Sequence, residues 1–192
     1  MAALRRAAII VALLNLAYFA VEFGMASAIG STALFADSAD FFEDAAVNLL
    51  VALALGWPLV WRARIGMAMA VIAMVPALFA VWTAWLKVQG GEAPNALALS
   101  LTGLGALLVN IVCAFMLARV RHQGGSLGKA AFLQARNDAL ANLAIIAAGL
   151  ITARSLSAWP DVIVGIGIFL LNLDAAKQVW ATARQERAEL VA

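Results

Sequence analysis

Charged side chains are scarce in this sequence. Aspartate, glutamate, lysine and arginine make up 12% of the 192 residues, about half the share that is typical of a soluble domain. Hydrophobic residues make up 65%, and the mean hydropathy is +0.95. No soluble core of this length uses so much apolar sequence, and disordered chains contain far less of it. The composition therefore excludes a soluble enzyme and a disordered protein, and it predicts an integral membrane protein.

Cysteine, histidine and surplus positive charge are nearly absent as well. The single Cys113 lies in an apolar run, which excludes a disulfide framework or a cysteine-based zinc site within one subunit. We interpret Cys113 as a small buried hydrophobe. The one histidine, His122, lies in a predicted loop. The net charge of +2 comes from scattered basic residues, so we expect no nucleic-acid partner.

Six segments are apolar over the roughly 20 residues that a helix needs to cross a bilayer core. Glycine, proline and serine mark the breaks between them. The sequence therefore predicts an all-α integral membrane protein with six transmembrane helices. We expect a single transmembrane domain, residues 1–192, and no soluble domain. The predicted helices cover residues of about 5–29, 32–57, 64–88, 95–119, 129–152 and 159–182.

Basic residues gather at one set of predicted helix ends. Only Lys87 and Arg154 lie at the opposite ends, and Arg136 falls inside a span. By the positive-inside rule, we expect both termini in the cytoplasm. Arginine outnumbers lysine ten to three in an alanine-rich chain, which is typical of a GC-rich bacterial genome. With six spans, we therefore expect a multi-pass protein of a bacterial inner (plasma) membrane. The gathered residues are Arg5, Arg6, Arg62, Arg64, Arg119, Arg121, Lys129, Lys177, Arg184 and Arg187.

Apart from Asp161 and the basic residues at the helix ends, eight ionisable residues fall inside the predicted spans. Each costs about 2.5–3.5 kcal/mol at the centre of a membrane helix. Seven are acidic and one is basic, so Arg136 neutralises few of them, and we expect it to pair with Asp174. The other carboxylates must be protonated, solvated in a cavity or bound to a cation. The eight residues are Glu22, Asp37, Asp40, Glu43, Asp44, Arg136, Asp138 and Asp174.

Two of the predicted helices carry one polar face each. On the second helix the acids stand at i, i+3 and i+7 with a fourth beside them, and on the fifth helix polar residues repeat at i, i+4 and i+8. Asp40, Asp44 and Asp138 fall near the bilayer centre, and buried oxygen ligands are what a divalent cation requires. The alternative is a set of hydrogen bonds between protonated acids. The two faces comprise Asp37, Asp40, Glu43 and Asp44, and Gln134, Asp138 and Asn142.

The first predicted helix carries a smaller polar face. Asn15, Tyr18 and Glu22 share it. Glu22 and Asp37 are both displaced toward the outer side of the membrane. They either line an outer vestibule or form a structural hydrogen bond, and the spacing alone favours neither.

Three of the predicted helices carry recognisable motifs. The second begins with STALFADS at residues 31–38, followed by Asp40-x-x-x-Asp44 and Asn48. The fifth contains ARNDALAN at residues 135–142, and the sixth begins with Trp-Pro-Asp at residues 159–161. Together these motifs resemble the cation diffusion facilitator (CDF) family. The resemblance covers all six spans, and the paired motifs of the second and fifth helices are its specific part.

The resemblance implies a secondary transporter rather than an enzyme, with no cofactor. Such proteins export divalent transition metals, of the Zn, Cd, Fe, Mn and Co class, from the cytoplasm by proton antiport, and they form homodimers. Metal ions and protons are thus the expected substrates, and the lipid bilayer and a second copy of the chain are the expected partners. The family's metal ligands correspond here to Asp40, Asp44, Gln134 and Asp138.

Two features depart from the family pattern. Gln134 stands where histidine or aspartate is usual, and the loss of imidazole favours Mn²⁺ or Fe²⁺ over Zn²⁺. Family members also carry a cytoplasmic domain after the sixth helix, whereas this chain ends at Ala192, about ten residues past the last predicted span. We therefore expect a short form that dimerises through its membrane helices.

Two other functions are compatible with aspartates inside a membrane. An intramembrane aspartyl protease needs a Gly-x-Gly-Asp element, but here Gly165-Ile166-Gly167 is followed by Ile168. A membrane assembly subunit without transport of its own is the second alternative. Metal flux measured in vesicles distinguishes a transporter from both.

Overall fold

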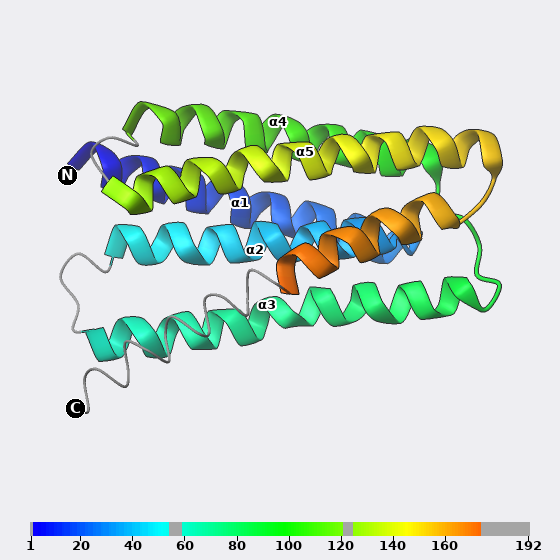
Figure 1. Ribbon diagram of the computed structural model, residues 1–192, viewed down its shortest axis with the longest axis horizontal. Helices are drawn as coiled ribbons and strands as arrows, with labels where there is room; N and C mark the ends of the chain where they lie inside the picture. Colours follow the sequence, from blue (N-terminus) through cyan, green and yellow to red (C-terminus); the bar gives the residue numbers. More distant parts are fainter. Residues whose placement is uncertain (1, 54–58, 121–124, 174–192) are drawn as a thin grey trace.

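The computed structural model describes residues 2–53, 59–120 and 125–173. Within these ranges, the side chains of residues 2, 51, 53, 59–70, 72, 73, 120 and 125–136 lie outside the description. The helices lie side by side along the long axis of the molecule, and the described ranges contain no strand (Figure 1). A sixth helix begins at Trp159 and is described to Leu173. The five helices before it are α1 (Ala2–Ile29), α2 (Thr32–Leu53), α3 (Leu59–Val88), α4 (Ala96–Val120) and α5 (Gly125–Ser155).

The helices have the length and composition of membrane spans. Among the described residues, Ala3–Ile29, Ala96–Arg119 and Asn137–Ser155 are long and apolar enough to cross a membrane, and Met74–Val88 and Trp159–Leu173 are shorter apolar segments. The 22 residues of α2 extend over about 33 Å, but its acidic residues lower its hydropathy. The protein is an all-α membrane protein, as predicted. The side on which its termini lie stays a prediction.

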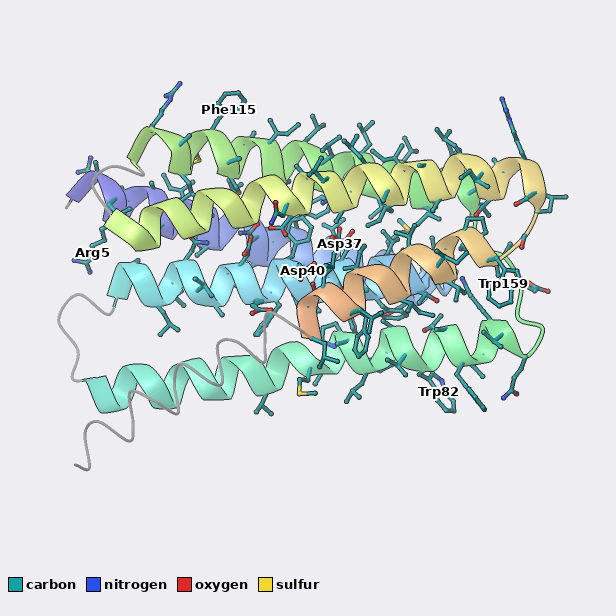
Figure 2. The ribbon with its side chains drawn as sticks, viewed as in Figure 1. Arg5, Asp37, Asp40, Trp82, Phe115 and Trp159 are labelled. Atoms are coloured by element: carbon teal, nitrogen blue, oxygen red, sulfur yellow. The ribbon has the colours of Figure 1, made fainter. Side chains whose placement is uncertain are left out.

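The outward faces of the bundle are apolar. Large hydrophobic side chains point away from its interior on α1, α3, α4 and α5, and Phe115 is 69% exposed and Trp82 59% exposed (Figure 2). Apolar exposure on this scale is unfavourable in water and suits the hydrocarbon core of a bilayer. The surface therefore agrees with the composition, because both require an apolar solvent.

The turns after α1, α3 and α5 lie at one end of the bundle, which we call the Lys87 end, and the N-terminus lies at the other (Figure 1). Gly30 follows α1 with φ of 60°, and Gly90 follows α3 with φ of 102°; both angles favour glycine. Ser31 then begins the next helix, because its hydroxyl accepts the backbone N–H of Leu34 at 3.1 Å. The reversal that starts α2 is therefore encoded locally by Gly30-Ser31.

Small residues allow the helices to approach closely. α2 contacts α1, α3 and α5, and α4 packs along α5 and α1. The hydroxyl of Tyr18 in α1 donates to the backbone carbonyl of Thr102 in α4 at 2.6 Å, beside Gly105, whose missing side chain leaves room for Tyr18. On the sixth helix, Gly165 lies against the backbone of Thr32 at the start of α2. These contacts fix α2 between its neighbours.

Gly165 and Gly167 provide a matched test of the contact between the sixth helix and α2. A Cβ atom at Gly165 would lie 2.7 Å from the carbonyl carbon of Thr32, whereas a Cβ at Gly167 meets nothing within 4 Å. We expect Gly165→Ala to destabilise the folded protein by about 1–3 kcal/mol, because the helices must separate. Gly167→Ala should melt at or above the wild-type temperature. Thermal unfolding in detergent measures both, and equal melting temperatures would contradict the close contact.

Candidate functional site

The acidic face predicted on α2 points into the bundle. Asp37 and Asp40 are buried, and both lie near the middle of the bundle's long axis (Figure 2). Glu43 and Asp44 are half-buried. The helical spacing therefore predicts correctly that these residues share one inward face. Packing of the bundle buries Asp37 and Asp40.

Asp138 of α5 meets this face, as the two polar stripes predict. It is 5% exposed, and its carboxyl group is within hydrogen-bond distance of that of Asp44. Two carboxyl groups make such a contact only when a proton or another cation lies between them. The structure therefore brings Asp44 and Asp138 together from different helices, with Asp40 one helical turn from Asp44.

The predicted ligand set is only partly described. The side chain of Gln134 lies outside the described residues, as do the side chain of Arg136 and the whole of Asp174. Among the described residues, no three carboxylate, histidine or cysteine groups converge as ligands of one metal ion. The side chain of Asp40 lies beside Asn172 of the sixth helix.

An asparagine follows each of the two paired aspartates by one helical turn. The amide of Asn48 donates to the backbone carbonyl of Asp44 at 2.9 Å, and the amide of Asn142 donates to that of Asp138 at 2.6 Å. Both asparagines are buried. Of the face predicted on the fifth helix, Asp138 and Asn142 therefore lie inside the bundle.

A second acid pair lies beside the first. Glu22 of α1 and Asp37 of α2 are fully buried, and their carboxyl groups are within hydrogen-bond distance of each other. Among the described residues, their four oxygen atoms have no hydrogen-bond donor. Of the two predicted interpretations, the structure therefore favours the hydrogen bond over an open vestibule. The pair needs a shared proton or a cation for the same reason as the first.

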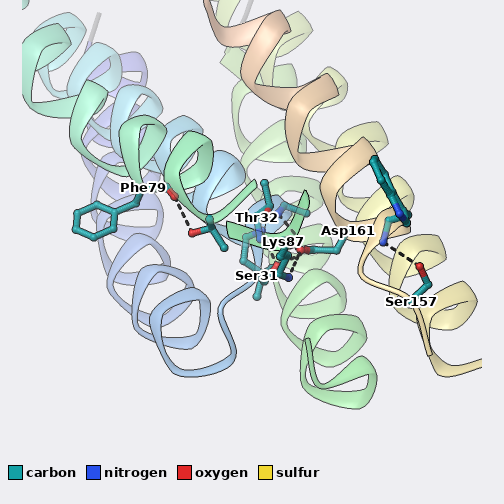
Figure 3. A network of polar contacts seen from close by, with 10 residues as sticks. Ser31, Thr32, Phe79, Lys87, Ser157 and Asp161 are labelled. Carbon is teal, nitrogen blue, oxygen red and sulfur yellow. Dashed lines mark hydrogen bonds and ion pairs between the residues drawn. The ribbon is translucent and has the colours of Figure 1, made fainter. Parts of the chain in front are cut away.

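A buried ion pair holds the start of α2 at the Lys87 end (Figure 3). The ammonium group of Lys87 lies 2.7 Å from Oδ2 of Asp161, and the two side chains are 6% and 0% exposed. Asp161 also accepts hydrogen bonds from the hydroxyl of Ser31 at 2.6 Å and from the backbone N–H groups of Thr32 at 2.8 Å and Ala33 at 3.2 Å. A carboxylate at a helix N-terminus is favourable, because it accepts otherwise unpaired N–H groups.

The role of this ion pair was not predicted from the sequence, where Asp161 stands out only as part of a motif and Lys87 only as a basic residue at the less basic helix ends. A usable signal was present, because Lys87 ends one predicted span and Asp161 begins another at the same end of the bundle. A single lysine and a single aspartate at equal depth are expected to pair in an apolar surrounding.

These features define a class of protein: an all-α membrane bundle whose buried carboxylates hold protons or cations. Residues 65–186 match the family described as the cation efflux transmembrane domain. The match covers more than half of the chain, and the protein therefore belongs to the cation efflux family, which is the CDF family of the sequence analysis. It is a cation transporter of that kind. The matched region includes Asp138 and begins after the α2 carboxylates. No curated protein matches the chain.

Removal of Lys87 tests the ion pair. We expect Lys87→Met to destabilise the protein by about 3–5 kcal/mol, because Asp161 is left as an uncompensated buried charge. Adding Asp161→Asn should recover part of the loss, because the charge is removed. Arg154→Met is the control, since Arg154 is exposed at the same end of the bundle. Unfolding in detergent measures all of these variants, and equal losses for Lys87→Met and Arg154→Met would contradict the assignment.

Proposed function

We propose that this cation transporter is a secondary transporter that exports divalent transition metals from the cytoplasm in exchange for protons. The observation that carries the proposal is the meeting of Asp44 from α2 with Asp138 from α5, with Asp40 one turn away. Carboxylates on two helices form a site that changes whenever those helices move. Such a site suits alternating exposure of a bound ion to the two sides of a membrane.

The ligand chemistry supports a divalent metal as substrate. Asp40, Asp44 and Asp138 supply oxygen atoms, and Gln134 would add an amide oxygen on the same face of α5 as Asp138. Oxygen ligands without imidazole or thiolate favour Mn²⁺ or Fe²⁺ over Zn²⁺ within the Zn, Cd, Fe, Mn and Co class. Parallel flux measurements with these ions identify the substrate.

The charge balance supports protons as the exchanged ion. The two acid pairs at the centre of the bundle each require a proton or a cation, and Lys87 is engaged by Asp161. Metal ions bind deprotonated carboxylates and so displace protons from them. Entry of a metal at Asp44 and Asp138 therefore releases the proton that joins these acids.

Assembly and location belong to the same proposal. The apolar outward faces of α1, α3 and α4 suit contact with lipid and with a second copy of the chain, so we propose a homodimer that associates through membrane helices in a bacterial inner membrane. The protease alternative lacks its Gly-x-Gly-Asp element, since Ile168 follows Gly167. Neither alternative accounts for carboxyl pairs drawn from three helices.

Substitution of the three aspartates tests the metal site. We expect Asp40→Asn, Asp44→Asn and Asp138→Asn each to lower metal flux in vesicles to the level of empty vesicles, because a neutral amide replaces a charged ligand. The yield and the detergent-solubilised size should stay unchanged. Glu92→Gln is the control, since Glu92 is exposed in the turn after α3. Near-normal flux in two of the three variants refutes the assignment.

An imposed pH gradient tests the exchange. With the vesicle lumen acidic, metal uptake should accelerate, because protons leave as the metal enters; with the lumen alkaline, uptake should slow. A pH-sensitive dye in the lumen should report alkalinisation when metal is added outside. Vesicles that contain the Asp138→Asn variant are the control. Metal flux that ignores both gradients would instead indicate a uniporter or a channel.

A further inference from the structure

Asn172 of the sixth helix makes two contacts with α2 at the candidate metal site. Its amide nitrogen donates to the backbone carbonyl of Ala36 at 3.4 Å, and its side chain lies beside the carboxylate of Asp40, one turn further along α2. The carbonyl of Ala36 can only accept, so the NH₂ group of Asn172 faces α2. That group has two hydrogens, one for each acceptor. A neutral donor is thus held against one of the candidate ligands.

The position of Asn172 follows from a row of contacts between the sixth helix and α2, which we call the seam. Asp161, Gly165 and Asn172 stand at i, i+4 and i+11, within about 40° of one another around the sixth helix. On α2 their contacts fall at residues 31–33, then at Thr32, and then at Ala36 and Asp40. Both helices begin at the Lys87 end (Figure 1). The ion pair therefore fixes a register in which Asn172 arrives at Asp40.

We propose that Asn172 is the positioning residue of Asp40, and that its amide sets the affinity of the metal site by orienting that carboxylate. This inference rests on the proposed function. One N–H group occupies part of the carboxylate and leaves lone pairs free for a metal. The donor carries no charge, so it does not repel the cation. Groups that orient metal ligands in this way typically contribute 10–100-fold to metal affinity.

Two substitutions of similar size distinguish an orienting role of Asn172 from a role as a metal ligand and from a role in packing alone. Asn172→Leu removes the donor, and Asn172→Asp keeps the shape but replaces the donor with an acceptor. Leu171→Ala is the control, because Leu171 is 70% exposed on the same helix. The full-length protein in vesicles is assayed for Mn²⁺ flux. We expect both Asn172 variants to raise the KM about 10–100-fold and to leave the maximal rate within about twofold. Leu171→Ala should match the wild type.

The flux results have clear opposing outcomes. If Asn172 is itself an oxygen ligand, Asn172→Asp should lower the KM, and the proposal is overturned. If Asn172 only packs the sixth helix, both variants should lose melting temperature and maximal rate at an unchanged KM, and the proposal is overturned as well. Asp44→Asn, assayed in parallel, tests the proposed metal site separately from the role of Asn172. Its flux should vanish whether or not Asn172 orients Asp40.

An infrared measurement on the metal-free protein keeps the test independent of transport. The carboxyl band of Asp40 is assigned by its loss in Asp40→Asn. It should shift in Asn172→Leu, because a hydrogen bond to the group is lost, and it should not shift in Leu171→Ala. An unshifted band overturns the proposal even where the wild type transports metal. If the band shifts in Asn172→Leu but the wild type transports no metal, the contact between Asn172 and Asp40 is upheld and the proposed function is refuted.

Discussion

Carboxylates in an apolar bundle impose one requirement on this protein, which is that their charge be neutralised where they lie. Asp161 meets it with Lys87, as a buried ion pair. The acids at the centre meet it with one another, in the pairs Asp44–Asp138 and Glu22–Asp37. A carboxyl pair is neutral only with a proton or a cation between its members. Under the proposed function, these acid pairs are where protons and metal ions compete.

α2 is the helix on which these contacts converge. Asp161 and Lys87 hold its first turn, Gly165 lets the sixth helix approach its backbone, and Asn172 reaches Asp40 two turns later. Because the seam runs along both helices, a shift of the sixth helix along its axis moves the amide of Asn172 relative to Asp40. The position of Asn172 relative to Asp40 thus depends on the ion pair at the first turn of α2.

Much of the architecture could be predicted from the sequence. Composition and segment length give an all-α membrane protein, and helical periodicity places Asp37, Asp40 and Asp44 on one inward face. The motifs of the second and fifth helices also named the family. The partners of individual side chains were harder to predict. Asn172 was not selected, because one asparagine in an apolar helix has no periodic neighbour to mark it.

The sequence by itself determined which residues share a face of one helix, since the helical repeat fixes the angle between them whatever surrounds the helix. It also determined that the solvent is a bilayer, because no aqueous fold buries this much apolar surface. Only the tertiary structure decided that Glu22 faces Asp37, that Lys87 reaches Asp161 and that Asp40 lies beside Asn172. Those pairings depend on how each helix is rotated and shifted against its neighbours. That arrangement results from many small packing contacts, such as Gly165 against Thr32, which no pattern within a single helix records.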